Sequence, residues 1–520
     1  MPYDYQPYPY TPPPGLTAPE PRHRVVIVGA GPIGLAMALE LANFGVASVI
    51  LDDNNRVSVG SRAICWSKRS LEIFDRLGIG DRVLEKGVTW KVGRTFHRDR
   101  EVFNFDLLPE DGHKMPAFVN LQQYYVEEYL IDAVLDQPLI DLRFQNKVTS
   151  IDQTGDSAFV DVETPDGEYA LETDYILACD GARSPIRHAM GLDFEGELFE
   201  ERFLIADIEM EANFPPERHF WFEPAFHPGQ SALLHKQPDN IYRIDLQLGW
   251  EADPEHEKRP EVVIPRIEKV VGHDRFRLEW VSVYTFQCRR LDSFVHDRVI
   301  FVGDSAHVVS PFGARGGNGG LQDVDNLGWK LAAVLQGRAD RGLLDTYDAE
   351  RRFGADENIR NSSRSTRFMT PGDGAERLFR DEVLALAAKA PFAQSWVNSG
   401  RLSAPCVYPT TGPDDPTLPQ GTRPGAVAAD ARLATGEWLL PQLTGEPTLL
   451  ALGTTAPNLT GVRSLTPKLT EDLTHRYLGD AACAVYLIRP DQVIAARWTD
   501  ATDAQIQAEL DTIWTGARCI

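Results

Sequence analysis

Residues 24–52 read RVVIVGAGPIGLAMALELANFGVASVILD, the pattern of an apolar strand, a glycine turn, an apolar helix and a second apolar strand. The turn carries Gly29, Gly31 and Gly34 in the spacing GxGxxG. The first glycine allows the tight turn, the second lets the backbone approach a pyrophosphate, and the third lets helix and strand pack closely. Asp52 ends the second strand, where an acid can bond ribose hydroxyls. The stretch predicts a Rossmann-like α/β domain that binds a dinucleotide. The alternative is a glycine turn that only packs a helix on a strand.

Composition limits the function classes. The chain has 520 residues, of which 43% are hydrophobic and 25% charged, a balance typical of a globular protein. This length predicts about three domains. Lys and Arg number 52 against 76 Asp and Glu, which gives a formal net charge of -24. Because nucleic-acid affinity depends on cationic side chains that neutralise phosphates, no nucleic-acid partner is expected.

Cysteine usage and the N-terminus bear on location. The six cysteines form no CxxC pair, so no metal site and no disulfide framework are expected, and a cytoplasmic protein is predicted. The N-terminus, MPYDYQPYPYTPPPG, has no basic segment followed by an apolar one, so no signal peptide is expected, and residues 1–22 are predicted to form a flexible arm. Pro32 and Glu40 interrupt the most apolar segment, 25–51, so no membrane span is expected.

The remaining sequence divides into segments of different pattern. Residues 23–190 and 291–398 predict one discontinuous α/β domain. Between them, residues 191–290 carry short aromatic-rich strands separated by Pro, Gly and Asn, which predicts an inserted antiparallel sheet. Residues 399–425 are rich in Gly, Pro and Thr and predict a linker, and residues 426–520 again mix strands with helices.

Two further turns contain an aspartate directly after an apolar strand. Asp180 opens DGARSPIR, which ends at Arg187, and Asp304 lies in GDSAH. The C-terminal ends of strands are where α/β proteins bind ligands, so the two acids could bond ribose or ribityl hydroxyls and Arg187 could offset phosphate charge. Taken alone, each turn reads equally well as a turn capped by its aspartate.

The motifs GxGxxG, DGxxSxxR and GDxxH, in this order, resemble those of the single-component FAD-dependent aromatic hydroxylases (class A flavoprotein monooxygenases). That group includes p-hydroxybenzoate, phenol and 3-(3-hydroxyphenyl)propionate hydroxylases. The resemblance covers about residues 24–360 and includes PFGARGGN at 311–318. It implies that the discontinuous domain binds FAD, that NADH or NADPH is the co-substrate, and that a small aromatic substrate reacts with O2. In this family a flavin C4a-hydroperoxide hydroxylates the phenolic ring.

The resemblance also assigns residues to the cofactor. It places the glycine turn at the pyrophosphate and Asp52 at the adenosine ribose. It gives the backbone N–H groups of Gly317 and Asn318 to the flavin N1–C2=O edge, where preorganised donors stabilise developing negative charge. The other residues that it implies at FAD, some of them also at NAD(P)H, are Arg62, Gln123, Asp180, Arg187, Asp304 and Gly316.

By the same resemblance the substrate lies between the flavin and the inserted sheet. A phenol must lose its proton to become nucleophilic, so a His or Tyr relay is expected near the pocket. Arg243 could bind a carboxylate, and Pro311 could present its carbonyl. An ordinary role in the sheet stays open for every lining candidate. These candidates are His219, Trp221, His235, Tyr242 and Arg243, and the predicted catalytic set is His219, Tyr242, Arg243 and Pro311.

The C-terminal segment, 426–520, resembles the thioredoxin-like domain of phenol-hydroxylase-type enzymes through YLIRPD at 486–491 and AARW at 495–498. Without CxxC it cannot perform dithiol chemistry, which leaves a structural role or a homodimer contact. Other functions remain open on the same FAD fold, because a fold does not fix a substrate. They are a polyketide- or quinone-tailoring monooxygenase (hydroxylase or epoxidase) and a non-catalytic FAD-binding protein. A halogenase is disfavoured because the sequence has no WxWxIP run.

Overall fold

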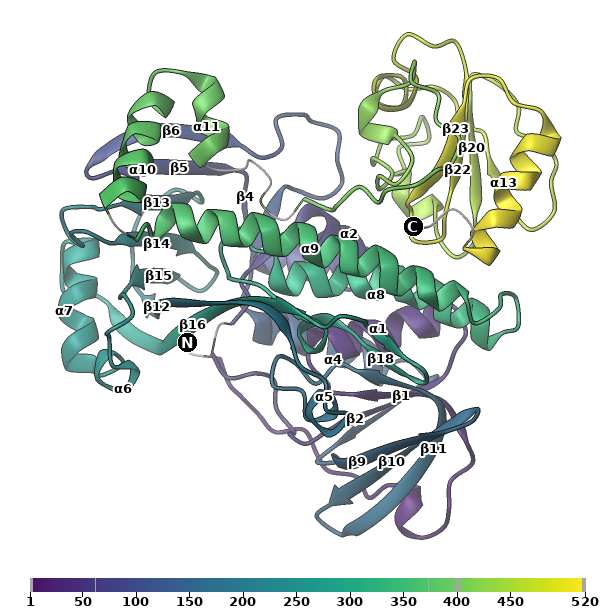
Figure 1. The fold of residues 1–520 in the computed structure, drawn as a ribbon, viewed down its shortest axis with the longest axis horizontal. Coiled ribbons are helices and arrows are strands. Elements are labelled where there is room, and N and C mark those ends of the chain that lie inside the picture. The colour runs from purple at the N-terminus through teal and green to yellow at the C-terminus, as the bar shows by residue number, and fades with distance from the viewer. Residues whose placement is uncertain (1–2, 61, 373, 398–401, 403, 517–520) are drawn as a thin grey trace.

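The computed structural model describes residues 3–60, 62–372, 374–397, 402 and 404–516. Three parts are visible in Figure 1: a sheet with helices over one face, a second sheet to its left, and a C-terminal unit at the upper right. The long helices α8 (Gly316–Leu335) and α9 (Leu343–Met369) run between these parts.

The first sheet contains the glycine motif. Its parallel strands pair in the order β18-β11-β1-β2-β8, and β17, β9 and β10 extend it in antiparallel fashion. α1 (Pro32–Asn43) packs against α8 and against α4 (Gln123–Leu135). The strands are β1 (His23–Val28), β2 (Ser48–Asp52), β8 (Ile140–Phe144), β9 (Lys147–Thr154), β10 (Ser157–Thr164), β11 (Gly167–Ala178), β17 (Val295–His296) and β18 (Val299–Phe301).

The second sheet is the predicted insertion, and it is larger than residues 191–290. Its order is β19-β16-β12-β15-β14-β13-β5-β6, so two strands come from the N-terminal third of the chain. β5 pairs with β13 in parallel across more than a hundred residues, a long-range contact that local sequence patterns do not reveal. The strands are β5 (Val92–His97), β6 (Arg100–Asp106), β12 (Glu195–Glu209), β13 (Arg218–Phe222), β14 (Ser231–Lys236), β15 (Ile241–Gln247), β16 (Arg277–Arg290) and β19 (His307–Val308).

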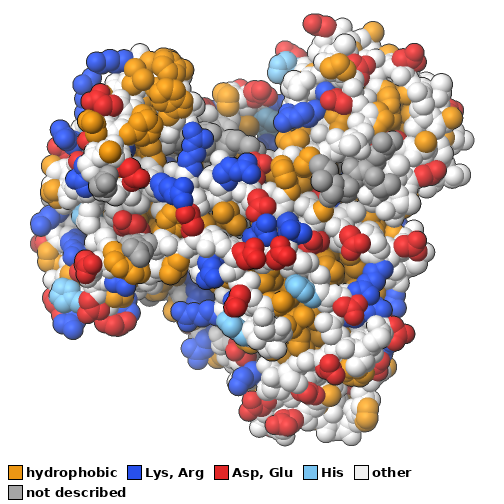
Figure 2. Space-filling view, in the orientation of Figure 1, with side chains coloured by type: hydrophobic (Ala, Val, Ile, Leu, Met, Phe, Trp, Pro, Cys, Tyr) orange, Lys and Arg blue, Asp and Glu red, His pale blue; other side chains and the backbone are white. Residues whose placement is uncertain are grey.

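The helices within residues 374–397 lie at the β6 edge of the second sheet. α10 packs against β6, while its outer side and α11 present an apolar patch to solvent, visible at the upper left of Figure 2. The remaining helices are α2 (Lys68–Arg76), α3 (Gly80–Lys86), α5 (Pro185–Ala189), α6 (Pro254–Glu257), α7 (Pro260–Val271), α10 (Gly374–Ala387) and α11 (Pro391–Val397). A small sheet joins β3 (Cys65–Ser67), β7 (Phe118–Asn120) and β4 (Val88–Trp90).

The C-terminal unit has a four-stranded sheet in the order β21-β20-β22-β23, with one parallel pair and two antiparallel pairs. This arrangement is compatible with the thioredoxin-like prediction, although residues 453–462, which connect the parallel pair, contain no helix. Arg489 bonds to Glu350 of α9 at 2.6 Å and ties the unit to the first domain. The elements are β20 (Thr448–Leu452), β21 (Arg463–Leu465), α12 (Glu471–Leu473), β22 (Ala484–Ile488), β23 (Ile494–Trp498) and α13 (Asp503–Thr515).

The N-terminal arm, for which the sequence predicts flexibility, packs against the first domain. Tyr3 Oη donates to Glu128 of α4 at 2.7 Å, and the Tyr8 ring stacks on Phe144 at 4.9 Å. Tyr5 Oη accepts the N–H of Gly60 at 3.2 Å. Aromatic rings bury large apolar areas even in a Pro-rich segment, which explains why the arm adheres to the domain. Within the described residues, no helix has the length and apolar character that crossing a membrane requires.

Candidate active site

The glycine turn leaves open space before the first turn of α1. A Cβ on Gly34 would lie 1.9 Å from the carbonyl oxygen of Gly29, and Gly29 itself has φ +107°, so both positions require glycine. A Cβ on Gly31 would meet no atom within 4 Å. Backbone N–H groups at a helix N-terminus carry partial positive charge, and this space lies directly before them. The turn therefore fits the pyrophosphate of a dinucleotide.

Asp52 lies beside this turn and holds it. Its Oδ2 accepts the N–H of Ala30 at 2.6 Å, and its Oδ1 accepts the N–H of Asn54 at 2.8 Å. Burial raises the pKa of Asp52 although both N–H donors act in the opposite direction. The predicted ribose contact of Asp52 remains a prediction.

Asp180 carries a carboxylate oxygen without a partner. Its Oδ2 accepts from Ser184 Oγ at 2.8 Å and from the N–H of Ile186 at 3.2 Å. Its Oδ1 is buried and bonds to none of the described residues. Burial raises the pKa of this acid above its ordinary value. A buried, unpartnered acceptor of this kind suits a ligand hydroxyl.

Arg187 joins the two aspartate turns. Its guanidinium donates to the carbonyl of Ser305 at 3.2 Å and to that of Ala182 at 2.8 Å, and it lies 3.9 Å from the ring centroid of Phe194. These contacts give Arg187 a structural role, and its predicted nucleotide contact stays a prediction.

Asp304 keeps accessible surface, whereas the residues around it are buried. Surrounding protein nevertheless raises its pKa, with His307 opposing the shift. An acid that is accessible and yet desolvated lies in a recess. Behind it, Asp323 Oδ2 accepts the N–H of Gly303 at 2.9 Å and His307 Nε2 at 2.7 Å. His307 thus orients the loop that carries Asp304.

The N-terminus of α8 supplies the predicted donors. Gly316, Gly317 and Asn318 form its first turn, and the N–H of Gly319 is bonded to the Arg315 carbonyl at 2.7 Å. The three preceding N–H groups therefore have no carbonyl partner within the helix. They form a preorganised positive edge of the kind that a reduced flavin requires.

The side chain of Asn318 fixes this edge in place. Its Oδ1 accepts from Ser67 N at 3.0 Å and from Ser70 Oγ at 2.6 Å. Its Nδ2 donates to the carbonyls of Cys65 at 2.8 Å and Ala314 at 2.6 Å. The start of α8 is thereby attached to β3 and α2.

Gln123 and Arg62 belong to the same region. Gln123 accepts the N–H of Ala63 at 3.1 Å and donates to Glu127 at 2.7 Å, so it positions the loop that precedes β3. Arg62 is exposed, and its carbonyl accepts from Arg243 at 3.1 Å. Their predicted contacts with FAD remain predictions.

The second sheet faces the loop that precedes α8 across a cavity of about 580 Å³, its open mouth included. Arg218, Phe220 and Phe222 of β13 line it together with Phe312 and Gly313, which precede α8. The cavity therefore lies between the sheet and the predicted flavin edge. Its aromatic walls suit an aromatic ring.

His219 and Trp221 lie on the opposite face of β13, because successive side chains of a strand alternate. The His219 ring packs against Phe96, Phe214 and Trp221, and burial lowers its pKa. The prediction chose the strand that borders the cavity. On that strand, however, it chose residues of the face that points away from the cavity.

The other predicted catalytic residues differ from one another. Tyr242 is buried on the far face of the second sheet, which is the face that carries His219 and Trp221. Its hydroxyl donates to the Ala212 carbonyl at 2.8 Å. Arg243 lies on the near face, which is the face that Phe220 and the other cavity-lining residues of β13 share, and it donates to Asp207 at 3.2 Å. Pro311 is exposed, and its carbonyl accepts the N–H of Ala314 at 3.0 Å, so that oxygen closes a turn. The predicted catalytic roles of these residues remain predictions.

The near face also carries Arg218 and Asp245, two charged residues that the sequence analysis did not select. Arg218 and Asp245 face the same side as His235 and Arg243 by strand register. The signal is present in IYRIDLQ, where Arg243 and Asp245 alternate with apolar residues in a strand that is buried on both sides. Charged residues in that position are rare in a sheet unless they serve a site.

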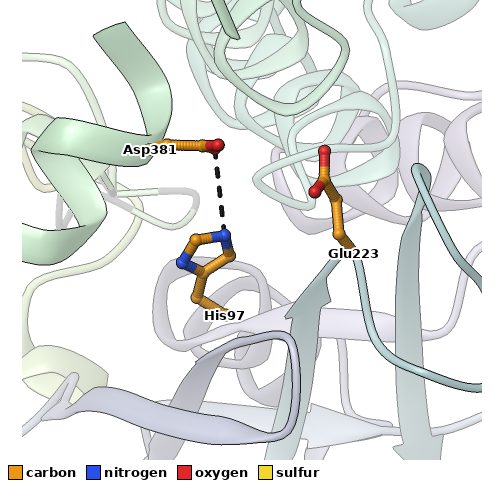
Figure 3. Close-up of side chains that lie close together, drawn as sticks. All are labelled: His97, Glu223 and Asp381. Carbon is orange, nitrogen blue, oxygen red and sulfur yellow. Dashed lines mark ion pairs between the residues drawn. The ribbon is translucent and has the colours of Figure 1, made fainter. Parts of the chain in front are cut away.

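One further cluster could in principle hold a cation. Figure 3 shows His97, at the end of β5, with Asp381 of α10 and Glu223, which follows β13. Their ligand atoms lie within 4.8 Å of one another. Arg380 already donates to Glu223 at 2.5 Å and to Asp381 at 2.8 Å. Because its guanidinium neutralises both carboxylates and would repel a cation, we interpret the cluster as the contact that holds α10 on the sheet.

Residues 22–362 match a protein family described as an FAD binding domain. The chain belongs to this family. A 3-(3-hydroxy-phenyl)propionate/3-hydroxycinnamic acid hydroxylase of Mycolicibacterium smegmatis is 29% identical over 374 residues, which are 72% of this chain and 66% of that protein. A flavin-dependent monooxygenase of Mycobacteroides abscessus is 30% identical over 491 residues, which are 90% of this chain and 96% of that protein. The chain thus spans just under two thirds of the first relative.

Solved structures confirm the predicted fold class. The flavin-dependent monooxygenase PieE, in complex with FAD and substrate, superposes with a TM-score of 0.78 at 22% identity, over 95% of this chain and 99% of that chain. The OxyS anhydrotetracycline hydroxylase from Streptomyces rimosus gives a TM-score of 0.73 at 26% identity, over 96% and 100% of the two chains. The family match, together with the relatives named as a hydroxylase and a flavin-dependent monooxygenase, also confirms the predicted resemblance to FAD-dependent hydroxylases.

Proposed function

We propose that this protein is an FAD-dependent, NAD(P)H- and O2-consuming monooxygenase that hydroxylates a phenolic or related aromatic compound. The observation that carries the proposal is the aromatic cavity between the second sheet and the N-terminus of α8. This cavity places a pocket that suits an aromatic ring beside the backbone N–H groups at the start of α8, which suit the flavin edge. The relatives named as hydroxylases support the same chemistry.

Within this proposal the chain's own residues bind and orient. The turn at Gly31 holds the pyrophosphate, and Asp52, Asp180 and Asp304 serve the sugar and ribityl hydroxyls. The N–H groups of α8 stabilise negative charge at the flavin edge. Bound FAD would supply electron transfer from NAD(P)H and the activation of O2. Phe220, Phe222 and Phe312 exclude water and orient the ring.

The test uses the purified flavoprotein under anaerobic conditions. It is mixed with NADH or NADPH, with and without each member of a phenol panel, and the bleaching of oxidised flavin is timed. We expect one aromatic class to accelerate bleaching and to yield a hydroxylated product after O2 is admitted. Bleaching by neither nucleotide with any aromatic compound would contradict the proposal.

A matched pair of variants ties the effect to the cavity. Phe220→Trp fills the cavity from β13 and should abolish the stimulation by the aromatic compound. Trp221→Phe changes the neighbouring residue on the opposite face and should leave the stimulation intact. Equal behaviour of the two variants would show that the aromatic compound binds elsewhere.

A polycyclic polyketide is the second candidate substrate. The match to OxyS, named an anhydrotetracycline hydroxylase, covers 96% of this chain and 100% of that chain, whereas the match to the hydroxyphenylpropionate relative covers 72% of this chain and 66% of that protein. Including polycyclic phenols in the panel separates the two candidates, because the substrate is the compound that accelerates flavin bleaching. For the C-terminal unit we propose a structural or homodimer-forming role.

A further inference from the structure

Asp245 of β15 is a carboxylate without a partner on the near face of the second sheet. Its Oδ1 is buried and unbonded, and the residue forms no ion pair within the part of the chain that the structure describes. The side chain keeps some accessible surface, so it can be reached from the space above the sheet. Burying an unpaired acid costs stability, which argues for a role toward a ligand.

Arg218 of β13 is its counterpart. Its Nε is buried without a partner, and the residue lines the cavity. Strand β14 separates β13 from β15, and at the usual strand spacing this places the two backbones about 10 Å apart. No ion pair joins the two side chains within the described residues, although each charge influences the pKa of the other group. A substrate hydroxyl held over β14, between the two side chains, could contact both.

We propose that Asp245 accepts the hydroxyl proton of the aromatic substrate and that Arg218 binds the resulting anion. This inference rests on the proposed function. The substrate O–H bond breaks and a new O–H bond forms on the Asp245 carboxylate. The electron pair of the broken bond stays on the substrate oxygen as negative charge beside the guanidinium. No electron is transferred and no further reactant is needed.

Several titratable or charged groups face this position from the neighbouring elements. They are Asp207 of β12, Arg218 of β13, His235 of β14, Arg243 of β15 and Cys65 of β3.

The other facing groups are poorly suited to take the proton. Asp207 accepts from Arg243 and from Gln237, both at 3.2 Å. Burial, with Arg218 and Arg243 nearby, holds the pKa of His235 well below its ordinary value, so it is a weak base. Burial raises the pKa of the Cys65 thiol to about 12, which keeps it protonated.

The pKa of Asp245 suits a group that accepts a proton near neutral pH. Burial raises its pKa to about 6 against the opposing effect of Arg243. At neutral pH the carboxylate is therefore ionised and yet more basic than an ordinary aspartate. A general base with a pKa close to the working pH is the most effective.

The test compares the pH profile of hydroxylation by the flavoprotein and by Asp245→Asn, using the phenol that accelerates flavin bleaching. The wild-type rate should fall below about pH 6, where Asp245 is protonated. In Asp245→Asn the rate at pH 7 should fall at least tenfold and then recover as the pH rises toward the ionisation of the phenol itself. Asp245→Glu should restore part of the rate.

Binding provides a second measurement. Arg218→Gln should weaken binding of the same phenol at high pH, where it binds as the anion, more than at low pH. An Asp245→Asn profile that parallels the wild type would overturn the role of Asp245 and leave the proposed function standing. If the wild type hydroxylates no aromatic compound, the proposed function fails and this inference fails with it.

Discussion

Asp323 of α8 links the predicted FAD turns to the helices behind them, and its replacement by Asn should destabilise the protein strongly. The carboxylate is fully buried. It accepts Arg351 Nε at 2.6 Å on one oxygen, and His307 Nε2 and the N–H of Gly303 on the other. An Asn side chain has one acceptor oxygen and one NH2 donor. In Asp323→Asn the NH2 group therefore faces a group that is itself a donor, and Arg351 loses its countercharge.

The expected loss follows from the geometry. Removing one partner of a buried ion pair typically costs about 3–5 kcal/mol. If the roughly 340 residues of the FAD-binding match unfold as one unit, this corresponds to a fall in Tm of about 4–7 °C. Burial alone would raise the pKa of Asp323, but His307 and Arg351 outweigh it and the pKa is lowered. The stabilisation is therefore complete above the ordinary Asp pKa and is lost as the pH falls from that value through the lowered pKa of the folded protein.

Thermal unfolding at pH 7.5 with saturating FAD is the assay, because a fixed ligand excess removes differences in occupancy. Asp292→Asn is the matched control, since Asp292 is 80% exposed and lies 3.5 Å from Arg352. Exposed pairs contribute at most about 1 kcal/mol, so this variant should shift Tm by no more than about 1–2 °C. An Asp323→Asn shift as small as that of the control would refute the reasoning.

Three other changes have expected outcomes. Gly34→Ala should yield protein almost free of flavin, because the new Cβ would lie 1.9 Å from the Gly29 oxygen; normal flavin absorbance would contradict this. Arg380→Ala should make α10 sensitive to limited proteolysis, because the guanidinium bonds to two carboxylates, whereas the half-exposed Arg377→Ala should not; equal cleavage rates would argue against the contact. Tyr5→Phe removes the acceptor for a backbone N–H in the loop after β2. It should raise the FAD dissociation rate about two- to tenfold, measured by the recovery of flavin fluorescence, and an unchanged rate would show that the arm does not restrain the loop.

The sequence did not predict the strand order of the second sheet or the face on which each side chain lies. A shift of one residue in strand register exchanges the two faces of a sheet, so short strands such as HFWF do not reveal which side meets the pocket. Tyr242 and His219 are chemically attractive, but they face away from the cavity, whereas Arg218 and Asp245 share its face. The contribution of β5 and β6 to this sheet likewise depends on a pairing between distant segments.

The sequence by itself determined the cofactor-binding half of the protein. Residues 24–52 specify a strand, a turn and a helix through contacts between near neighbours, and Gly29 and Gly34 meet steric requirements that no other residue meets. Asp180 and Asp304 could be placed for the same reason, since each follows its strand directly. Only the tertiary structure decided which side chains line the cavity beside α8 and that the N-terminal arm is packed. Those features arise where segments distant in sequence meet, and local chain preferences do not encode such contacts.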